Sequence, residues 1–185
     1  MPGRTAERGK GSASGVRVSA PVRRFTLNFL ALVALFSALI HIDIEAFDGV
    51  TTRWMTRHVA EVVAQTMSLG GADVAHNDDL ITYRATTFEV LADCTGVEVI
   101  GLFVAAVLAF PARWRDRLAA LLAGIPVLLL LNLARMITLI YFGARSATAL
   151  HYGHLYVWPI ILLTTALGIW LQWARSASGD LRLRL

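Results

Sequence analysis

The chain has a single cysteine, few prolines and few charged residues. Of its 185 residues, one is cysteine, five are proline and 16% are charged. One cysteine cannot form an intramolecular disulfide, which excludes a covalent framework. The low charge accompanies a hydrophobic content of 56%, which falls in blocks long enough to cross a bilayer. We therefore expect an integral membrane protein rather than a soluble domain.

Four apolar blocks stand out. They cover residues 25–42, 95–110, 118–142 and 154–173, and each predicts a transmembrane helix. Pro111 closes the second block, and Pro126 lies inside the third, where it is expected to introduce a kink. The predicted fold class is an all-α polytopic membrane protein with four transmembrane helices.

The two ends of the chain differ in composition from its apolar centre. Residues 1–22 are rich in Gly, Ser, Arg and Ala without an apolar period, which predicts a disordered basic tail. Residues 23–175 form the expected membrane domain, and 176–185 a C-terminal tail.

The longest polar interval, residues 43–93, predicts a small structured segment outside the helical bundle. Residues 51–69 have the pattern of an amphipathic helix. Its expected apolar face comprises Trp54, Met55, His58, Val59, Val62, Val63, Thr66 and Met67. Further on, β-branched and aromatic residues around "NDD" predict a short β-hairpin.

The basic residues predict the orientation in the membrane. The net charge of +4 could suggest nucleic-acid binding, but the basic residues flank the apolar blocks without interleaved aromatic residues, so no nucleic-acid partner is expected. They concentrate before the first block, between the second and third, and after the fourth, whereas acidic residues dominate 43–93. By the positive-inside rule, both termini are cytoplasmic and 43–93 is extracytoplasmic.

Cys94 lies at the start of the second apolar block, on the expected outer side. A helix N-terminus favours a thiolate, while the carboxylate of Glu98 would raise the thiol pKa unless a cation neutralises it. Gly96 leaves space next to the thiol through which a substrate backbone could approach. The alternative is that Cys94 is a small buried hydrophobic residue, as most free cysteines are.

Arg135 is a charge within a predicted spanning helix. Such a charge costs about 2.5–3.5 kcal/mol on insertion scales, so it usually faces a cavity and serves a function. Asn132 lies three residues earlier on the same face and could hold the guanidinium. The alternatives are an arginine that snorkels to the interface, a structural pair with Glu98, and a helix-to-helix hydrogen bond for Asn132.

Two histidines, His151 and His154, precede the fourth block on the outer side. His154 could simply cap its helix at the interface, but together with Cys94 and Arg135 it is a candidate general base and acid. His151 competes for that role. The pair could also bind a metal, although no third ligand is evident, and we expect neither metal nor cofactor.

Three motifs in this order resemble those of a known family. "CTGVE" opens one helix, "NLARMITLIYFG" ends the next and "HLYVWPIILL" opens the last. Together they resemble the exosortase and archaeosortase family of membrane cysteine transpeptidases, and most nearly the exosortase H type. The resemblance implies that Cys94 is the nucleophile, Arg135 the essential cation and His154 the third catalytic residue.

The resemblance also implies a partner and a location. Such enzymes process proteins that end in a short motif, a transmembrane helix and a basic tail. We therefore expect a multi-pass protein of the bacterial cytoplasmic (inner) membrane, embedded in the lipid bilayer, with its site facing outward. Two other functions remain open: a non-enzymatic membrane assembly factor, and a metal-dependent membrane hydrolase that uses His151 and His154.

Overall fold

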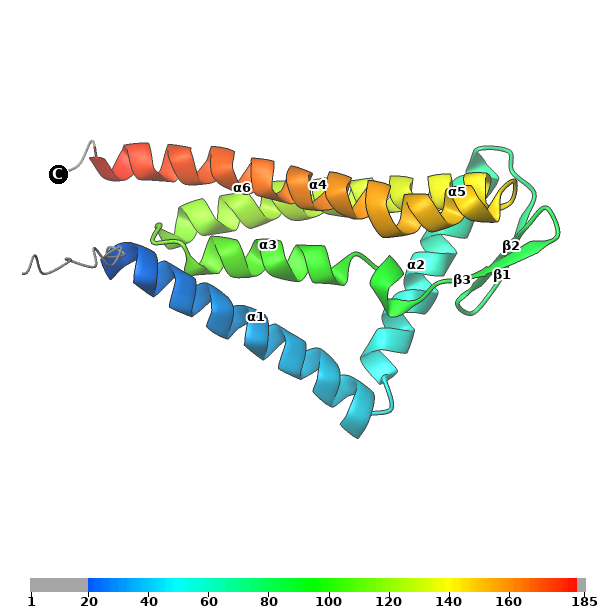
Figure 1. Cartoon of the computed structure of the whole chain (residues 1–185), viewed down its shortest axis with the longest axis horizontal. Helices are drawn as coiled ribbons and strands as arrows, with labels where there is room; N and C mark the ends of the chain where they lie inside the picture. Colours follow the sequence, from blue (N-terminus) through cyan, green and yellow to red (C-terminus); the bar gives the residue numbers. More distant parts are fainter. Residues whose placement is uncertain (1–19, 183–185) are drawn as a thin grey trace, which may run out of the picture.

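The computed structural model describes residues 20–182. Most of these residues form helices that run along the long axis of the molecule, while α2 and a small sheet lie at one end (Figure 1). The long helices are α1 (Ala20–Ala46), α3 (Val97–Ala109), α4 (Trp114–Gly143) and α6 (Trp158–Arg182). Residues 1–19 of the expected basic tail lie outside the described part of the chain, and the last expected segment is helical as far as Arg182.

Three helical segments of the described chain are long and apolar enough to cross a membrane: Val22–Ala46, Trp114–Gly143 and Ala147–Ser178. The apolar helix α3 has only 13 residues, or about 20 Å against a hydrocarbon core of about 30 Å. The expected count of four spans is therefore not confirmed. The block predicted at 95–110 is shortened because its first residues form a turn and Phe110 is already extended.

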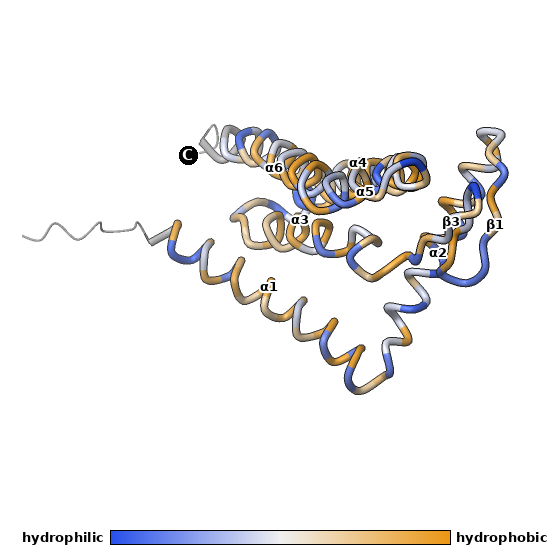
Figure 2. Tube along the Cα trace, turned by 45° about the vertical axis from the view of Figure 1, so that its right-hand side comes forward, coloured by the Kyte–Doolittle hydropathy of each residue, from blue (hydrophilic) through white to orange (hydrophobic). Residues whose placement is uncertain are grey.

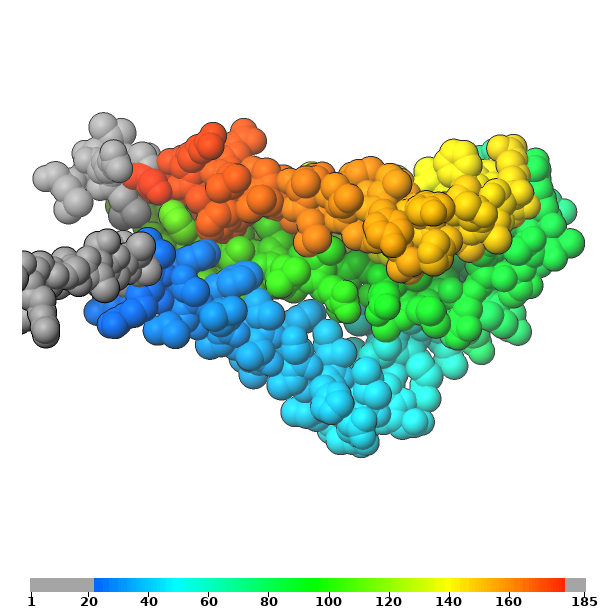
Figure 3. Space-filling view, viewed as in Figure 1, coloured from blue at the N-terminus to red at the C-terminus, as the bar shows by residue number. Residues whose placement is uncertain are grey.

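α3 lies between α1 and α6 and contacts both (Figure 3). Its buried Phe103 packs against α4 at Gly124, where a Cβ atom would lie only 2.3 Å from the phenyl ring. A second close approach occurs at Gly101, whose added Cβ would lie 2.5 Å from the ring of Phe36 in α1. Glycine therefore allows close packing on two sides of this short helix. Apolar residues dominate α1 and α3, and hydrophilic ones mark both ends of α1 (Figure 2).

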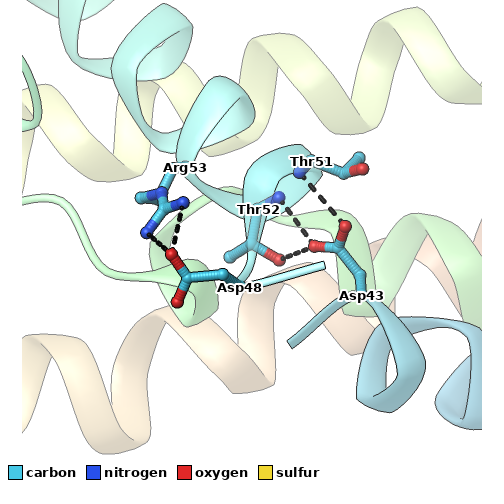
Figure 4. A network of polar contacts seen from close by, with 5 residues as sticks. All are labelled: Asp43, Asp48, Thr51, Thr52 and Arg53. Carbon is cyan, nitrogen blue, oxygen red and sulfur yellow. Dashed lines mark hydrogen bonds and ion pairs between the residues drawn. The ribbon is translucent and has the colours of Figure 1, made fainter. Parts of the chain in front are cut away.

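A sharp turn connects α1 to α2 (Val50–Leu69). The carboxylate of Asp43 accepts hydrogen bonds from the backbone N–H groups of Thr51 and Thr52, at 3.1 and 3.0 Å, and from the Thr52 hydroxyl (Figure 4). Arg53 also donates to Asp48, which lies within the turn at a φ of 52°. A side chain from the preceding helix thus satisfies the free N–H groups that begin α2.

The expected amphipathic helix is present, but its buried face differs from the prediction. Thr56, Ala60, Val63, Ala64 and Met67 are buried, whereas Trp54 and Val62 are 59% and 50% exposed. The buried cluster also contains Ile81 of the sheet and Ile140 of α4. Val63 and Met67 are buried as predicted, whereas the small Ala60 and Ala64 take the place of Trp54 and Val62 on the buried face.

The expected hairpin is part of a three-stranded antiparallel sheet in the order β1 (Val74–Asn77), β2 (Leu80–Tyr83), β3 (Thr86–Glu89). The first turn lies at Asp78 and Asp79, as "NDD" predicted. The second, unexpected turn places Arg84 and Ala85 at positive φ values of 49° and 62°. Two-residue hairpin turns need such angles and usually use Asn or Gly to adopt them. The sequence therefore gave no signal for the third strand.

α6 has a longer N-terminal part than predicted. Helix starts at α5 (Ala147–Tyr152), capped by the hydroxyl of Ser146, and continues through a π-helical segment, η2 (Gly153–Val157), into α6. The predicted block at 154–173 therefore begins inside a longer helix. The π-helical segment contains His154, and such segments are frequent at functional sites.

Candidate active site

Cys94 ends a short 3₁₀ turn, η1 (Ala92–Cys94), that joins β3 to α3. Its backbone N–H donates to the carbonyl of Leu91 at 2.9 Å, and the Thr95 hydroxyl donates to the carbonyl of Ala92 at 2.6 Å. Gly96 then adopts a φ of +77° and starts α3. This turn buries the cysteine to 7% exposure just before the helix.

Asn132 of α4 fixes this turn from the neighbouring helix. Its side-chain amide donates to the carbonyl of Cys94 at 2.9 Å, and it is only 4% exposed. A Cβ atom at Gly96 would lie 2.8 Å from the side-chain carbon of Asn132. We expected the missing side chain of Gly96 to admit a substrate backbone, but Asn132 occupies that space.

Arg135, 5% exposed, connects three parts of the site. One terminal nitrogen, Nη1, donates to the carbonyl of Asp93 at 3.2 Å and to Oδ1 of Asn132 at 3.4 Å. The other, Nη2, lies 3.3 Å from Nδ1 of His154. The predicted contact between Asn132 and Arg135 is therefore present, and the guanidinium links η1 to the π-helical segment η2.

Glu98 takes no part in this network. Among the described residues no ion pair joins it to Arg135. Its side chain instead lines a second cavity of about 460 Å³, bordered by Ile40 and Asp43 of α1 and by Met55 of α2. The structural pair of Arg135 with Glu98, one of the alternatives from the sequence, is thus absent. Glu98 follows Cys94 by one turn in sequence, but the turn at Gly96 sends the two side chains toward different cavities.

A cavity of about 500 Å³ lies at the sheet end of the bundle. Cys94, His151 and His154 all line it, together with apolar residues of α4 and α5. We expected the thiol, the guanidinium and the imidazole in one pocket; Cys94 and His154 do line one cavity, whereas Arg135 is not part of its lining and contacts His154 instead. The exposed His151 remains a second imidazole in the same cavity.

The electrostatic environment of Cys94 differs from the expectation of a stabilised thiolate. Burial raises the pKa of the thiol, while the charge of Arg135 lowers it and that of Asp93 raises it. Burial is the largest of these effects, so the free protein holds a protonated thiol near neutral pH. The carboxylate that opposes thiolate formation is Asp93 rather than Glu98.

Sequence reasoning missed one wall of this cavity. Thr87, Phe88, Glu89 and Leu91 line it beside the cysteine. They belong to β3 and to the residues directly after it. The sequence predicted a hairpin and did not indicate that β3 is a separate third strand. With the second turn unrecognised, nothing in the sequence placed these residues near His154.

No group of three His, Cys, Asp or Glu side chains suited to a metal ion occurs in the described part of the chain. The pair His151 and His154 therefore has no third protein ligand there, which a catalytic zinc site normally has. The hypothesis of a metal-dependent hydrolase gains no support from this arrangement.

Comparison with known proteins places the chain in a family. A family model described as transmembrane exosortase (Exosortase_EpsH) matches residues 15–171, which include Cys94, Arg135 and His154. No curated protein and no solved structure matches the chain. The match covers most of the 185 residues and agrees with the resemblance found in the three motifs. The chain therefore belongs to the transmembrane exosortase family and is a membrane protein.

Proposed function

We propose that this protein is a membrane cysteine transpeptidase or protease that cleaves the C-terminal sorting signals of exported proteins through a thioacyl intermediate. The observation that carries the proposal is that Cys94 and His154 line one cavity, while Arg135 contacts both His154 and the turn that holds Cys94. They come from η1, α4 and η2, elements that are far apart in the sequence. A buried charge within a membrane-spanning helix, such as that of Arg135, is characteristic of function rather than of packing.

In the proposed reaction the sulfur of Cys94 attacks the scissile carbonyl carbon. A C–S bond forms, the C–N bond of the peptide breaks, and the departing amine takes up a proton. The resulting thioester is resolved by an incoming amine in transpeptidation or by water in proteolysis. Arg135 stabilises the negative charge that develops on the carbonyl oxygen or orients the carbonyl.

The contact with Arg135 assigns a role to each nitrogen of His154. A guanidinium only donates hydrogen bonds, so Nδ1 accepts, and a neutral imidazole then carries its proton on Nε2. In this tautomer the Nε2–H of His154 donates a hydrogen bond, and the ring can protonate the leaving amine only as an imidazolium, after it has accepted a proton. It accepts the thiol proton at Nε2 only after a change of tautomer, so His151 is the competing candidate for that step.

The proposed orientation follows from the positions of the basic residues. The start of α1, the link between α3 and α4, and the end of α6 lie at one end of the bundle, opposite the sheet (Figure 1). Arg23 and Arg24, Arg113 and Arg115, and Arg175 belong to that end. We assign it to the cytoplasm of a bacterial cell by the positive-inside rule, which puts the cavity at the outer face of the inner membrane.

This placement suits the proposed substrate. A protein that ends in a short motif, a transmembrane helix and a basic tail would insert its helix alongside α3, α4 and α6. Its outer juxtamembrane bond would then lie at the level of Cys94. Cleavage at the membrane surface follows from the length of the substrate helix.

The test is co-expression of the protein with a tagged reporter that carries such a C-terminal signal. We expect Cys94→Ala and Arg135→Ala to abolish processing, and normal processing by either variant would refute the proposal. His154→Ala and His151→Ala identify the proton carrier, with the exposed His76→Ala as the matched control. A non-enzymatic assembly factor, by contrast, would retain full function as Cys94→Ser.

A further inference from the structure

The sheet has a free edge at the candidate active site. The strand order β1-β2-β3 makes β3 an outer strand. Thr87 and Glu89 of β3, and Leu91 just after it, line the cavity that contains Cys94 and His154. An outer strand offers unpaired backbone N–H and C=O groups to any chain that comes alongside.

The register identifies which of these groups are free. The N–H of Val90 donates to the carbonyl of Asp79 at 2.8 Å, so these two residues form a hydrogen-bonded pair in the β2–β3 register. Bonded and non-bonded pairs alternate along an antiparallel ladder. Phe88 therefore points its backbone groups at β2, whereas Thr87 and Glu89 point theirs away from the sheet.

Among the described residues, no further backbone hydrogen bond involves Thr87 or Glu89. The free groups are close to the cysteine along the chain, because Leu91 at the end of this edge accepts the hydrogen bond from the Cys94 N–H. The edge thus provides a row of peptide-binding groups that leads to the thiol. The lining contributed by α4, α5 and η2 includes the apolar Leu139, Leu150 and Leu155.

We propose that the substrate segment before the scissile bond binds as an extended strand on the free edge of β3, parallel to it. The proposal rests on the proposed function and adds its mode of substrate recognition: main-chain hydrogen bonds to Thr87 and Glu89, with apolar side chains toward α4 and α5. β3 leads toward α3 and hence toward the membrane. A substrate with an exported N-terminal domain and a C-terminal membrane helix runs in the same direction.

The experiment uses the full-length protein in detergent and measures alkylation of Cys94 by mass spectrometry. The probes are acetyl-alanine chloromethyl ketone and its tetra-alanine counterpart, in which the thiolate displaces chloride to form a C–S bond. Because the longer probe can pair with β3, we expect it to react about tenfold faster. Equal rates for the two probes would overturn the proposal.

Thr87→Pro removes one outward N–H and keeps the backbone hydrogen bonds to β2, at a position where a strand tolerates proline. It also removes the contact between the hydroxyls of Thr87 and Thr82, which lie 3.0 Å apart. We expect it to bring the ratio of the two rates close to one, with each rate divided by the rate of iodoacetamide alkylation of the same variant. His76→Pro is the matched control, because the β1–β2 register directs the His76 N–H to the opposite free edge. His76→Pro should keep the wild-type ratio of the two alkylation rates. If Thr87→Pro also kept that ratio, the proposed pairing with β3 would be refuted.

A second measurement needs no variant. Two tetra-alanine probes are N-methylated at adjacent nitrogens upstream of the reactive group. Neighbouring N–H groups of a strand point in opposite directions, so only one methylation should slow the reaction, by about tenfold. Equal effects of the two methylations would argue against a strand. Normal reporter processing by Cys94→Ala would refute the proposed function, whereas these ratios test only the pairing with β3.

Discussion

Nη2 of Arg135 lies 3.3 Å from Nδ1 of His154, and through this contact α4 holds the π-helical segment that precedes α6. The same guanidinium reaches the carbonyl of Asp93, directly before the cysteine. One side chain therefore fixes the relative positions of the imidazole and the turn that carries the thiol. This bridging role leads to the first prediction.

Arg135→Lys should lower the rate of reporter processing by about a hundredfold or more. Lysine keeps the charge but lacks the planar fork of donors that contacts Asp93, Asn132 and His154 together. Pulse-chase labelling of the reporter measures the rate. The exposed Arg145→Lys is the control and should process normally, while full activity of Arg135→Lys would show that charge alone suffices.

The reactivity of Cys94 should depend on pH in a defined direction. Burial raises the thiol pKa, so the rate of iodoacetamide labelling should rise with pH to a midpoint above the usual value of about 8.5. Arg135→Gln should move the midpoint further up because it removes the cation that lowers the pKa. Asp93→Asn should move it down. A wild-type midpoint below that of a free thiol would contradict the burial argument.

The same shift affects stability with a definite sign. The folded pKa of Cys94 is above the unfolded one, so the folded state favours the protonated thiol. This group therefore contributes stability below the unfolded pKa, and the contribution is lost as pH rises through the folded pKa. Thermal melting of wild type and Cys94→Ala at several alkaline pH values should show a steeper decline for the wild type.

Gly96→Ala should destabilise the protein more than Gly71→Ala. Both glycines have positive φ values, 77° and 81°, so each alanine incurs a strain of about 1–2 kcal/mol. Only at Gly96 does the added Cβ also meet Asn132, at 2.8 Å, whereas it meets nothing within 4 Å at Gly71. Melting temperatures in detergent provide the comparison. Equal losses would show that Asn132 moves aside without cost.

Gly124→Ala and Gly168→Ala should have opposite effects on stability. A Cβ at Gly124 would lie 2.3 Å from the buried ring of Phe103, and overpacking of this kind costs about 1–3 kcal/mol. At Gly168, exposed on α6, the Cβ meets nothing within 4 Å, and alanine is the better helix former by up to about 1 kcal/mol. Thermal melting tests both variants, and a neutral Gly124→Ala would argue against close packing of α3 on α4.

Several features of the site could be predicted from the sequence because they depend on local spacing. Asn132 and Arg135 share a helix face because they are three residues apart, and their contact is present. The order of the three motifs put cysteine, arginine and histidine at one end of the bundle, and two of these residues line one cavity. The family match agrees with the same motifs.

Other features depended on contacts between distant segments. α2 turns the small Ala60 inward, because it packs there with Ile81 of the sheet and Ile140 of α4. Glu98 lines a different cavity from Cys94 because the backbone at Gly96 reverses direction. Neither the buried side of α2 nor the position of Glu98 follows from the spacing of apolar residues. That spacing predicts that a helix has an apolar face, but not which segments pack against it.

The sequence by itself determined the membrane class of the protein, its long helices, the position of the cysteine before α3 and the family to which the chain belongs. Apolar blocks and motifs are local features, because their residues lie within a few helical turns of one another. They can therefore be recognised in the sequence without knowledge of the fold. Only the tertiary structure decided that β3 forms a wall of the cavity and that Arg135 connects Asp93 to His154. The contact of Arg135 with Asp93 alone joins residues 42 positions apart. The geometry of the site is set by helix packing and by a turn at Arg84 and Ala85 that carries no sequence signal.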